Sequence, residues 1–358
     1  MAIAAGTREF LALDAALGAR ELMEYCYEKG WTDGLPVVPP VQEFVDEFLS
    51  QTDRDPDEVL MVQEHLSRSC TVRHAAINAI MAGCKPEYFP VVLAVMDALD
   101  ASGIARGGLL QSTTGQAEII IVNGPIRQQL GFNSLGNLFG PGDRPNATVG
   151  RALRLIVMNV FGIRPHEFDQ STQGSATKYF CCIAENEEDS PWEPLHVSRG
   201  FSASESAATV QMVRSDVYVE HRSTQEPEEI LSTIADSMSY GGAVTQVTEV
   251  RNDLGAVVVM GPEHAQLIAA RGWSKHDCIQ FLFERFGKRK SELRRMGKLH
   301  PAFEGEPEDA FIPHGSSAKN VMLVVAGANN AGVSTVCPSI TIGREIGING
   351  TQKIYSRE

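Results

Sequence analysis

The sequence has little of what marks nucleic-acid-binding or membrane-surface proteins. Aromatic residues make up only 7% of its 358 residues, too few for a surface that stacks bases. The formal net charge is −14, whereas a nucleic-acid binder needs a basic surface that displaces counterions from phosphates. An acidic protein is also repelled by anionic lipid head groups. We therefore expect neither a nucleic-acid partner nor a membrane partner.

Long apolar runs and a cysteine framework are also lacking. No apolar run is long enough to span a bilayer. The start of the chain carries early charges and lacks the pattern of a cleavable signal. The seven cysteines are odd in number and show no framework spacing. These observations predict a cytoplasmic protein without structural disulfides.

Motifs for nucleotides and metals are missing too. The Gly-rich loop Gly136–Gly142 is neither GxGxxG nor GxxxxGK[ST], so a nucleotide cofactor is not expected. Cys70 and His74 are four residues apart and would share one helix face, where His65 or Cys84 could complete a divalent metal site. Cysteine is also among the most buried residue types for packing reasons alone. We predict no cofactor and leave a divalent metal open.

What is present centres on residues 117–162. The β-branched block Ile119–Val122 suits a strand buried on both faces. Asn123, Gly124 and Pro125 end that strand, and Pro125 favours the first turn of a helix. A second β-branched strand ends at Gly261-Pro262, before another helix that contains Gln-Leu. These matched segments predict a weak internal repeat of a strand, a Gly-Pro turn and a helix.

The helix after the Gly-rich loop is predicted to bind an anion. We expect Asn146 to be its N-cap, with Thr148 and Arg151 in the first turns. Unpaired amides at a helix start attract anions, and Arg144 and Arg151 could bind a carboxylate bidentately. The alternative is an ordinary capped helix with solvated arginines.

Three further places could supply acid–base or nucleophilic groups. The rigid loop around Asp33-Gly34 could carry Asp33 into a cleft, or Asp33 could cap its own turn. Cys84 lies at a predicted helix C-terminus, which would raise its pKa and disfavour a nucleophile. Glu185 and Asn186 follow a strand predicted over 178–184, and His196 lies nearby. They could perform acid–base work or bind a divalent ion, or they could belong to a solvated acidic loop.

The pattern predicts an α/β fold with mixed or mainly parallel sheets and flanking helices. We expect a largely helical region over 1–110, a central α/β region with the Gly-rich anion loop over 111–250, and a C-terminal α/β region over 251–358. Ligands of open α/β sheets gather at the carboxyl ends of strands. A common rim is therefore predicted for Asn123, Glu185, Asn186, the Met260–Gly261 turn, Asn329 and Asn330.

Several motifs together resemble a known group of proteins. GWTDGLPVVPP, NAIMAGCKPEYFPVV, VNGP, GPGDRPNATVGRALRL and CIAENEEDSPWEPLHVSRGF look like an uncharacterised bacterial family. That family is similar to domains found beside or fused to proteins with a UGSC selenocysteine or cysteine motif. The resemblance covers residues 30–201. This chain has no UGSC or CGSC sequence, so that redox chemistry is not carried over. The resemblance strengthens Asp33, Cys84, Asn146 and Glu185–Glu187 as candidates.

These observations favour an enzyme acting on a small anionic, carboxylate-bearing metabolite, a lyase or hydrolase working by side-chain acid–base chemistry. We expect the protein to bind a small-molecule substrate and to form a homo-oligomer. One alternative is a thiol-based oxidoreductase, or a partner of a thiol or selenol protein, that uses Cys84, Cys181 or Cys182. A second alternative is a non-catalytic binding subunit. The candidate catalytic residues are Asp33, Cys84, Glu185 and His196; the candidate substrate-binding residues are Asn123, Arg144, Asn146, Thr148, Arg151 and Asn186.

Overall fold

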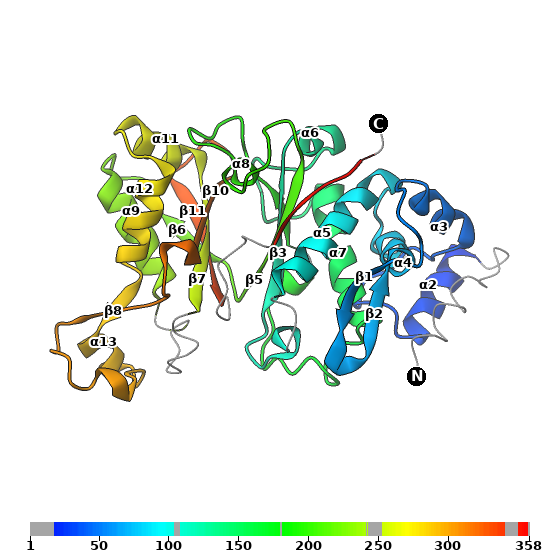
Figure 1. Cartoon of the computed structure of the whole chain (residues 1–358), viewed down its shortest axis with the longest axis horizontal. Coiled ribbons are helices and arrows are strands. Elements are labelled where there is room, and N and C mark those ends of the chain that lie inside the picture. The colour runs from blue at the N-terminus through cyan, green and yellow to red at the C-terminus, as the bar shows by residue number, and fades with distance from the viewer. Residues whose placement is uncertain are drawn as a thin grey trace.

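The structure, a computed structural model, describes residues 18–103, 108–179, 181–240, 242, 253–340 and 350–356. It is an α/β fold in which helices flank an eight-stranded mixed sheet (Figure 1), which confirms the predicted fold class. The amphipathic pattern over residues 8–29 favours a helix. Its described part is α2 (Ala19–Glu28), and residues 8–17 lie outside the described residues.

The N-terminal part forms a helical layer at one end of the molecule, on the right of Figure 1. Helix α4 begins at a capping box in which Thr71 accepts from the His74 amide, and it ends at Gly83, whose positive φ suits a helix C-terminus. The described elements of this layer are α2, α3 (Gln42–Leu49), β1 (Val59–Gln63), β2 (Arg68–Thr71), α4 (Val72–Ala82) and α5 (Phe89–Ser102).

The sheet has the strand order β10-β7-β11-β5-β3-β4, with β6 on β11 and β12 on β5. Two pairs are parallel, β3 with β4 and β7 with β10, and the other pairings are antiparallel. The strands are β3 (Ala117–Asn123), β4 (Cys182–Ala184), β5 (Ala207–Val213), β6 (Val217–Glu220), β7 (Leu254–Met260), β10 (Val321–Val325), β11 (Val333–Ile340) and β12 (Thr351–Lys353).

The predicted repeat is visible as two units of the same topology. In the first unit β3 lies between its parallel partner β4 and its antiparallel partner β5; in the second unit β7 lies in the same way between β10 and β11. The units also exchange strands, because β6 pairs with β11 and β12 pairs with β5. The helices of the two units are α6 (Ile126–Leu130) and α7 (Arg144–Asn159), and α9 (Pro227–Met238), α11 (Pro262–Ala270) and α12 (Lys275–Glu284).

The two outer strands of the sheet approach each other at their carboxyl ends. The Asn186 amide donates to the Val325 carbonyl at 2.8 Å, and the Val325 amide donates to Glu185 Oε1 at 3.4 Å. Alternate strand residues therefore enclose an apolar interior that includes Ile119, Val259 and Val324. The opposite strand faces pack against α4, α5 and α7 in the first unit and against α9, α11 and α12 in the second.

Two expectations about local structure were wrong. Where a strand was predicted over 178–184, the structure has the end of a 3₁₀ turn at Lys178 and the short strand β4 from Cys182. The basic, amphipathic pattern over 273–299 favours a single helix, but the structure splits it: α12 ends, β8 (Gly287–Arg289) pairs with β9 (Phe311–Pro313), and α13 (Lys290–Arg295) follows. Gly287 permits this pairing, since a Cβ there would overlap the Ile312 carbonyl.

The remaining short elements are 3₁₀ turns and one short helix. They are η1 (Glu64–Leu66), η2 (Pro86–Tyr88), η3 (Leu109–Gln111), η4 (Ala176–Lys178), η5 (Pro301–Phe303), η6 (Ala318–Asn320) and α8 (Leu195–Ser198).

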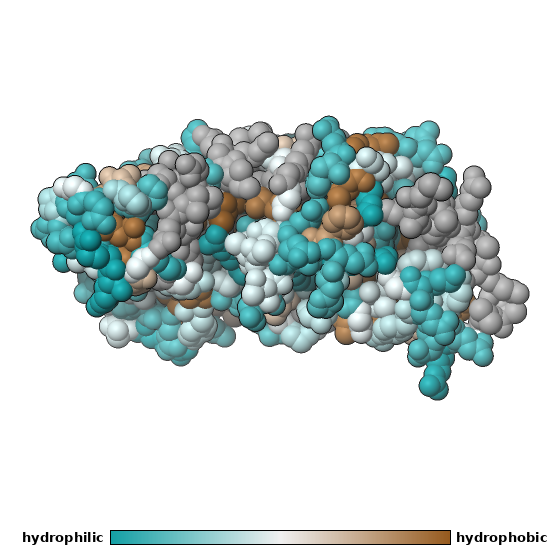
Figure 2. All heavy atoms as spheres, turned by 90° about the horizontal axis from the view of Figure 1, so that it is seen from below, coloured by the Kyte–Doolittle hydropathy of each residue, from teal (hydrophilic) through white to brown (hydrophobic). Residues whose placement is uncertain are grey.

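On the face drawn in Figure 2, apolar atoms appear in small groups separated by polar ones. The exposed large apolar side chains come from separate elements, for example Val59, Leu135 and Tyr218. Within the described residues, no helix is both long and apolar enough to cross a membrane.

Candidate functional site

The start of α7 differs from the predicted anion site. The N-cap is Asp143, not Asn146, because Pro145 lets the helix begin at Arg144. Asn146 lies in the first turn, where its side chain accepts from the Asn133 amide at 2.8 Å and donates to the Asn133 and Cys182 carbonyls. Asn146 thus connects Asn133, which precedes the Gly-rich loop, and β4 to the helix.

The two arginines predicted to bind the anion have protein partners. Arg151 forms a bidentate pair with Asp33, with both contacts at 2.8 Å. It also donates to the carbonyls of Leu35 and Pro36. Only 5% of the Asp33 side chain and 13% of the Arg151 side chain are exposed. This pair fixes the Asp33 loop against α7. Most hydrogen-bond donors of Arg151 are therefore occupied by protein acceptors, and Asp33 pairs with Arg151 rather than acting together with Glu185.

Arg144, Thr148 and Cys84 also interact with nearby protein groups. Arg144 Nε donates to the Gly83 carbonyl at 3.0 Å, and the Thr148 hydroxyl donates to the Arg144 carbonyl at 2.8 Å. Burial raises the pKa of the Cys84 thiol to about 12, although a hydrogen bond with Thr148 and the nearby arginines act in the opposite direction. A thiol of this kind is a poor nucleophile at neutral pH.

The other two candidate thiols are buried as well. Burial raises the pKa of Cys181 to about 12, and it raises the pKa of Cys182 well above its ordinary value. All seven cysteines are free and buried.

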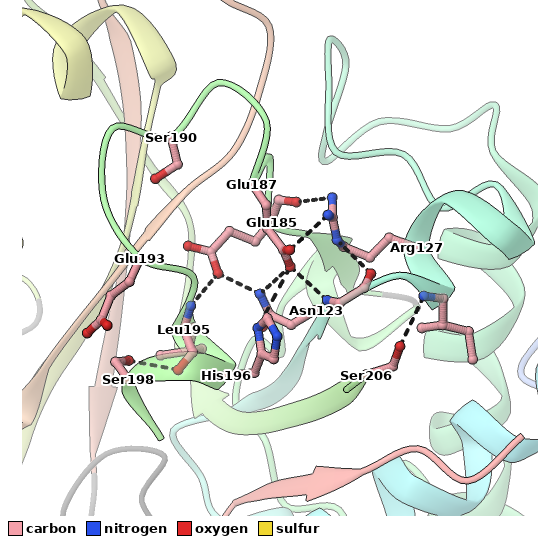
Figure 3. Close-up of polar contacts among 12 residues, drawn as sticks. Asn123, Arg127, Glu185, Glu187, Ser190, Glu193, Leu195, His196, Ser198 and Ser206 are labelled. Carbon is pink, nitrogen blue, oxygen red and sulfur yellow. Dashed lines mark hydrogen bonds and ion pairs between the residues drawn. The ribbon is translucent and has the colours of Figure 1, made fainter. Parts of the chain in front are cut away.

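The predicted rim at the carboxyl ends of the strands is a network of charged side chains (Figure 3). Glu185 is fully buried on the segment after β4. Its Oε2 accepts from Asn123 Nδ2 at 2.6 Å and from the Leu195 amide at 2.7 Å. Lys275 Nζ lies 3.9 Å from its Oε1. The strands therefore bring together two predicted site residues, Asn123 and Glu185.

Glu187, which the resemblance had strengthened as a candidate, and Arg127, which the sequence analysis did not select, complete this network. Glu187 Oε1 accepts from the Gly124 amide at 2.7 Å, and its Oε2 lies 3.0 Å from Arg127 Nη2. Arg127 also donates to the Glu185 carbonyl at 2.7 Å. The sequence signal was available, because Arg127 lies in the turn after Gly124-Pro125 and can reach the following strand end.

His196 faces this network without hydrogen bonding to it. The ring is fully buried, Nδ1 lies 3.9 Å from Glu187 Oε1, and neither ring nitrogen has a hydrogen-bond partner among the described residues. Asn186 donates to Asp189 Oδ2 and to the Gly327 carbonyl, and Asn329 donates to Gln266. The rim is thus filled by its own side chains around Asn123 and Glu185.

A large cavity lies at the other end of β4. We call it the Arg154 cavity; its volume is about 640 Å³. It is bounded by the second half of α7 and by the segment 165–179, which leads into β4. The residues that matter for its chemistry are Asp33, Arg154, Asp169, Ser171 and Lys178.

Asp169 is the centre of the polar cluster in the Arg154 cavity. Its Oδ2 accepts from Arg154 Nη2 at 2.9 Å and from Lys178 Nζ at 2.6 Å. The Ser171 hydroxyl hydrogen bonds to Asp169 Oδ1 and accepts from Lys178 Nζ at 2.6 Å. Although burial raises the pKa of Asp169, hydrogen bonds from Lys178 and Ser171 outweigh it and lower the pKa to about 2. Asp169 is therefore a carboxylate at neutral pH.

For Lys178, burial is the stronger effect, and the pKa follows it. Burial lowers its pKa more than the hydrogen bond with Asp169 raises it, and the nearby Arg154 charge lowers it further. A lowered pKa makes the Lys178 ammonium group a stronger acid than that of an exposed lysine. Glu118 on β3 acts on Lys178 in the other direction and offsets part of the positive charge.

Arg154 has an unused donor. It is only 5% exposed, and one terminal nitrogen, Nη2, is bound to Asp169. The other, Nη1, is buried without a hydrogen-bond partner among the described residues. A buried guanidinium N–H without an acceptor is costly, so a native structure normally supplies an acceptor.

The loop that carries this cluster is held by the segment before β3. The Gln170 amide donates to the Gln111 carbonyl, and the Thr172 amide donates to the Thr113 carbonyl. Gly174 has a positive φ, and a Cβ on Gly115 would overlap it. The sequence analysis missed Arg154, Asp169 and Lys178. Arg154 is three residues after Arg151 on the same helix, which was the one available signal.

Metal binding finds no support in the arrangement of side chains. Among the described ranges, no three His, Cys, Asp or Glu side chains gather as metal ligands would. His74 Nδ1 accepts from the Thr71 amide at 3.2 Å within the capping box of α4.

Comparison with known proteins does not assign the chain to a family. No protein-family model matches it, and neither a curated protein nor a solved structure matches it.

Proposed function

We propose that this protein is an enzyme of the lyase or hydrolase class that binds a small carboxylate-bearing metabolite in the Arg154 cavity. The observation that supports this most directly is that Arg154 lines a cavity of about 640 Å³ and that its buried Nη1 has no hydrogen-bond partner within the described part of the chain. A cavity of this size suits a small metabolite. A ligand carboxylate would supply the missing acceptor and form a charge-assisted hydrogen bond.

The cluster beside Arg154 supports acid–base chemistry on the bound molecule. Lys178 exchanges a proton with the substrate, because burial lowers its pKa and Ser171 and Asp169 hold its ammonium group in place. Asp169 stays ionised and orients Lys178 and Arg154 toward the same space. Ser171 hydrogen bonds to both Asp169 and Lys178, so it can relay the proton.

The charge of the cluster favours a single anionic group. Arg154 and Lys178 form ion pairs with Asp169, which leaves one positive charge in excess before Glu118 is counted. Asp33 lines the cavity, but its charge is neutralised by Arg151. One carboxylate beside Arg154 therefore fits better than a polyanion such as a nucleotide.

The two alternatives have less support. A thiol-based oxidoreductase needs an accessible cysteine of lowered pKa, whereas burial raises the pKa of Cys84, Cys181 and Cys182. A non-catalytic binding subunit would use the same cavity, but it would not need a lysine of depressed pKa held between a serine and an aspartate.

The test compares two arginines on one helix. We would measure the binding of a panel of two- to six-carbon mono- and dicarboxylic acids, with their amides as neutral controls, by calorimetry and thermal shift. Arg154→Gln is expected to weaken the binding of the preferred acid at least about tenfold, since it removes a charge-assisted contact. Arg144→Gln is the matched control and is expected to bind normally, because the Arg144 guanidinium donates to the Gly83 carbonyl and Arg144 is not among the residues that line the Arg154 cavity.

Three outcomes would contradict the proposal. No acid in the panel binds the native protein; the preferred acid binds Arg154→Gln as tightly as the native protein; or binding is lost in Arg144→Gln. The third outcome would favour an anion site at the start of α7.

A further inference from the structure

A second cavity lies at the carboxyl ends of β7 and β10. We call it the Ser334 cavity; its volume is about 450 Å³. Its walls are the Gly-rich loop at 136–139, Gly261 in the turn after β7, and the segment 326–335. Ser334, near the start of β11, is the lining residue that carries a buried hydroxyl.

Ser334 lies in a chain of hydrogen bonds whose direction is set by its ends. The Gly261 amide donates to Ser334 Oγ at 3.1 Å. Ser334 Oγ lies 2.8 Å from His264 Nδ1, and His264 Nε2 lies 2.9 Å from the His221 carbonyl oxygen. A carbonyl can only accept, so His264 Nε2 carries a proton. In the neutral ring Nδ1 is then the acceptor, and the Ser334 hydroxyl donates to it.

The surroundings keep His264 in this neutral form. Its side chain is fully buried on α11. Burial lowers its pKa, which outweighs the opposite effects of the His221 carbonyl and of Glu263. A neutral imidazole that accepts a serine proton, and is itself oriented by an acceptor on its other nitrogen, is the arrangement that activates a serine nucleophile.

The rest of the cavity suits an uncharged acyl group. Its lining includes Leu138, Phe139 and Ala328, together with the amide side chains of Asn137 and Asn330. Its one lining arginine, Arg222, is about half exposed and pairs with Glu220 at 2.9 Å.

The first unit shows that the fold does not require this pair. Val122 of β3 corresponds to Met260 of β7, because each is the last strand residue whose side chain packs against the helices of its unit. The partner of Val122 on β5 is Ala208. On β11, Thr335 is opposite Val259, and continuing this antiparallel register by one residue sets Ser334 against Met260. The first unit therefore has a methyl group at the position of Ser334. Its turn is held by different hydrogen bonds, from the Gly124 amide to Glu187 Oε1 and from the Ile126 amide to Ser206 Oγ.

We propose that Ser334 is a nucleophile, with His264 as its general base, for an acyl substrate such as a small neutral carboxylic ester. Ser334 Oγ attacks the carbonyl carbon and its proton passes to His264 Nδ1. The bond from carbon to the alkoxy oxygen then breaks, and the leaving alcohol takes the proton from His264. Water, deprotonated by the same imidazole, releases the carboxylic acid and regenerates the Ser334 hydroxyl. The site is separate from the Arg154 cavity and does not depend on the function proposed for it.

The test uses a fluorophosphonate probe, which modifies activated serines covalently, on the full-length protein. Intact mass and peptide mapping are expected to locate one adduct, on Ser334. Ser334→Ala is expected to abolish it. His264→Gln is expected to slow labelling about a hundredfold or more, because the general base is lost. Ser206→Ala is the matched control and is expected to label at the native rate.

Labelling of the native protein is enough to contradict the proposal, so the test does not depend on whether the variants fold. No adduct on Ser334 at excess probe would overturn it, and so would an adduct only on Ser171. An undiminished labelling rate in a His264→Gln variant whose circular dichroism matches the native protein would overturn it as well.

Discussion

The two units of the sheet have the same topology and opposite carboxyl ends. The end of the first unit is closed by the charged network around Glu185, whereas the end of the second unit opens into the Ser334 cavity. Both ends follow a buried strand and a Gly-Pro turn. The repeated motif therefore does not decide whether a ligand can enter.

Side-chain volume at matched positions explains the difference. Val122 pairs with Ala184 and Met260 pairs with Val325, which aligns the two strand ends. The aligned positions that follow are Asn123 with Gly261, Glu185 with Ala326, and Glu187 with Ala328. Large polar side chains fill the first end, and the glycine and alanines of the second end line the cavity.

The same alignment shows that the two Gly-Pro turns are one residue out of step. Ile119 and Ile121 face the sheet interior in the first unit, and Val257 and Val259 do so in the second. The last inward residue is Ile121 in the first unit, three residues before Gly124, and Val259 in the second unit, two residues before Gly261. A shift of one residue sends each side chain to the other face. Asn123 therefore faces Glu185, while Met260 packs under α11 and α12.

The largest effect is expected where the closed end loses its central carboxylate. Glu185→Ala leaves the amides of Leu195 and Val325 without their acceptor, while Asn123 Nδ2 keeps its hydrogen bond to Glu187. Each buried donor without an acceptor costs about 1–3 kcal/mol, so we expect the free energy of unfolding to fall by about 4 kcal/mol. Urea unfolding measures this. A loss below about 1 kcal/mol would mean that the network does not hold the two edges together.

An intermediate effect is expected at the two glycines. A Cβ on Gly124 would overlap the Glu205 carbonyl, and a Cβ on Gly261 would overlap the Val333 carbonyl. Each Gly→Ala variant should lose about 1–3 kcal/mol through this overlap. Gly124→Ala should lose about 1–2 kcal/mol more, because Gly124 has φ +84° and Gly261 does not have a positive φ. Thermal and urea unfolding compare the pair, and equal losses would contradict the difference in turn geometry.

The smallest effect is expected from protonation of His264 at the open end. Burial lowers its pKa below the ordinary value of 6.5, so the unfolded chain binds its proton first as the pH falls. Stability is then complete above about pH 6.5 and declines below it. His74, whose pKa burial also lowers, adds to the decline. The urea midpoint between pH 5 and 8 should fall less steeply in His264→Gln, and an unchanged slope would show that His264 is not buried as a neutral ring.

Local patterns predicted much of the fold. The β-branched strands predicted before Gly124-Pro125 and Gly261-Pro262 are buried strands, and the repeated strand and Gly-Pro turn are visible in both units. The pairing of β6, β11 and β12 could not be predicted in this way. Nothing local in the tail indicates that β11, which contains Pro338, would lie between β5 and β7, or that β6 and β12 would exchange units.

The candidate sites show the same limit more sharply. Asn123 and Glu185 were placed on one rim from strand order alone, and they do contact each other. Arg151 was selected as an anion donor, but its partner is Asp33, over a hundred residues earlier in the chain. Arg154, which has the free donor, shares the same helix and looks no different in sequence.

By itself the sequence determined which segments are strands and helices, where glycine must bend the chain, and that the two units repeat, because these depend on neighbouring residues and on the alternation of apolar side chains. Only the tertiary structure decided which charges neutralise each other, which end of the sheet stays open, and which donors are left without an acceptor. Those outcomes depend on distances between residues far apart in the chain, and a change of one residue in strand register is enough to reverse them.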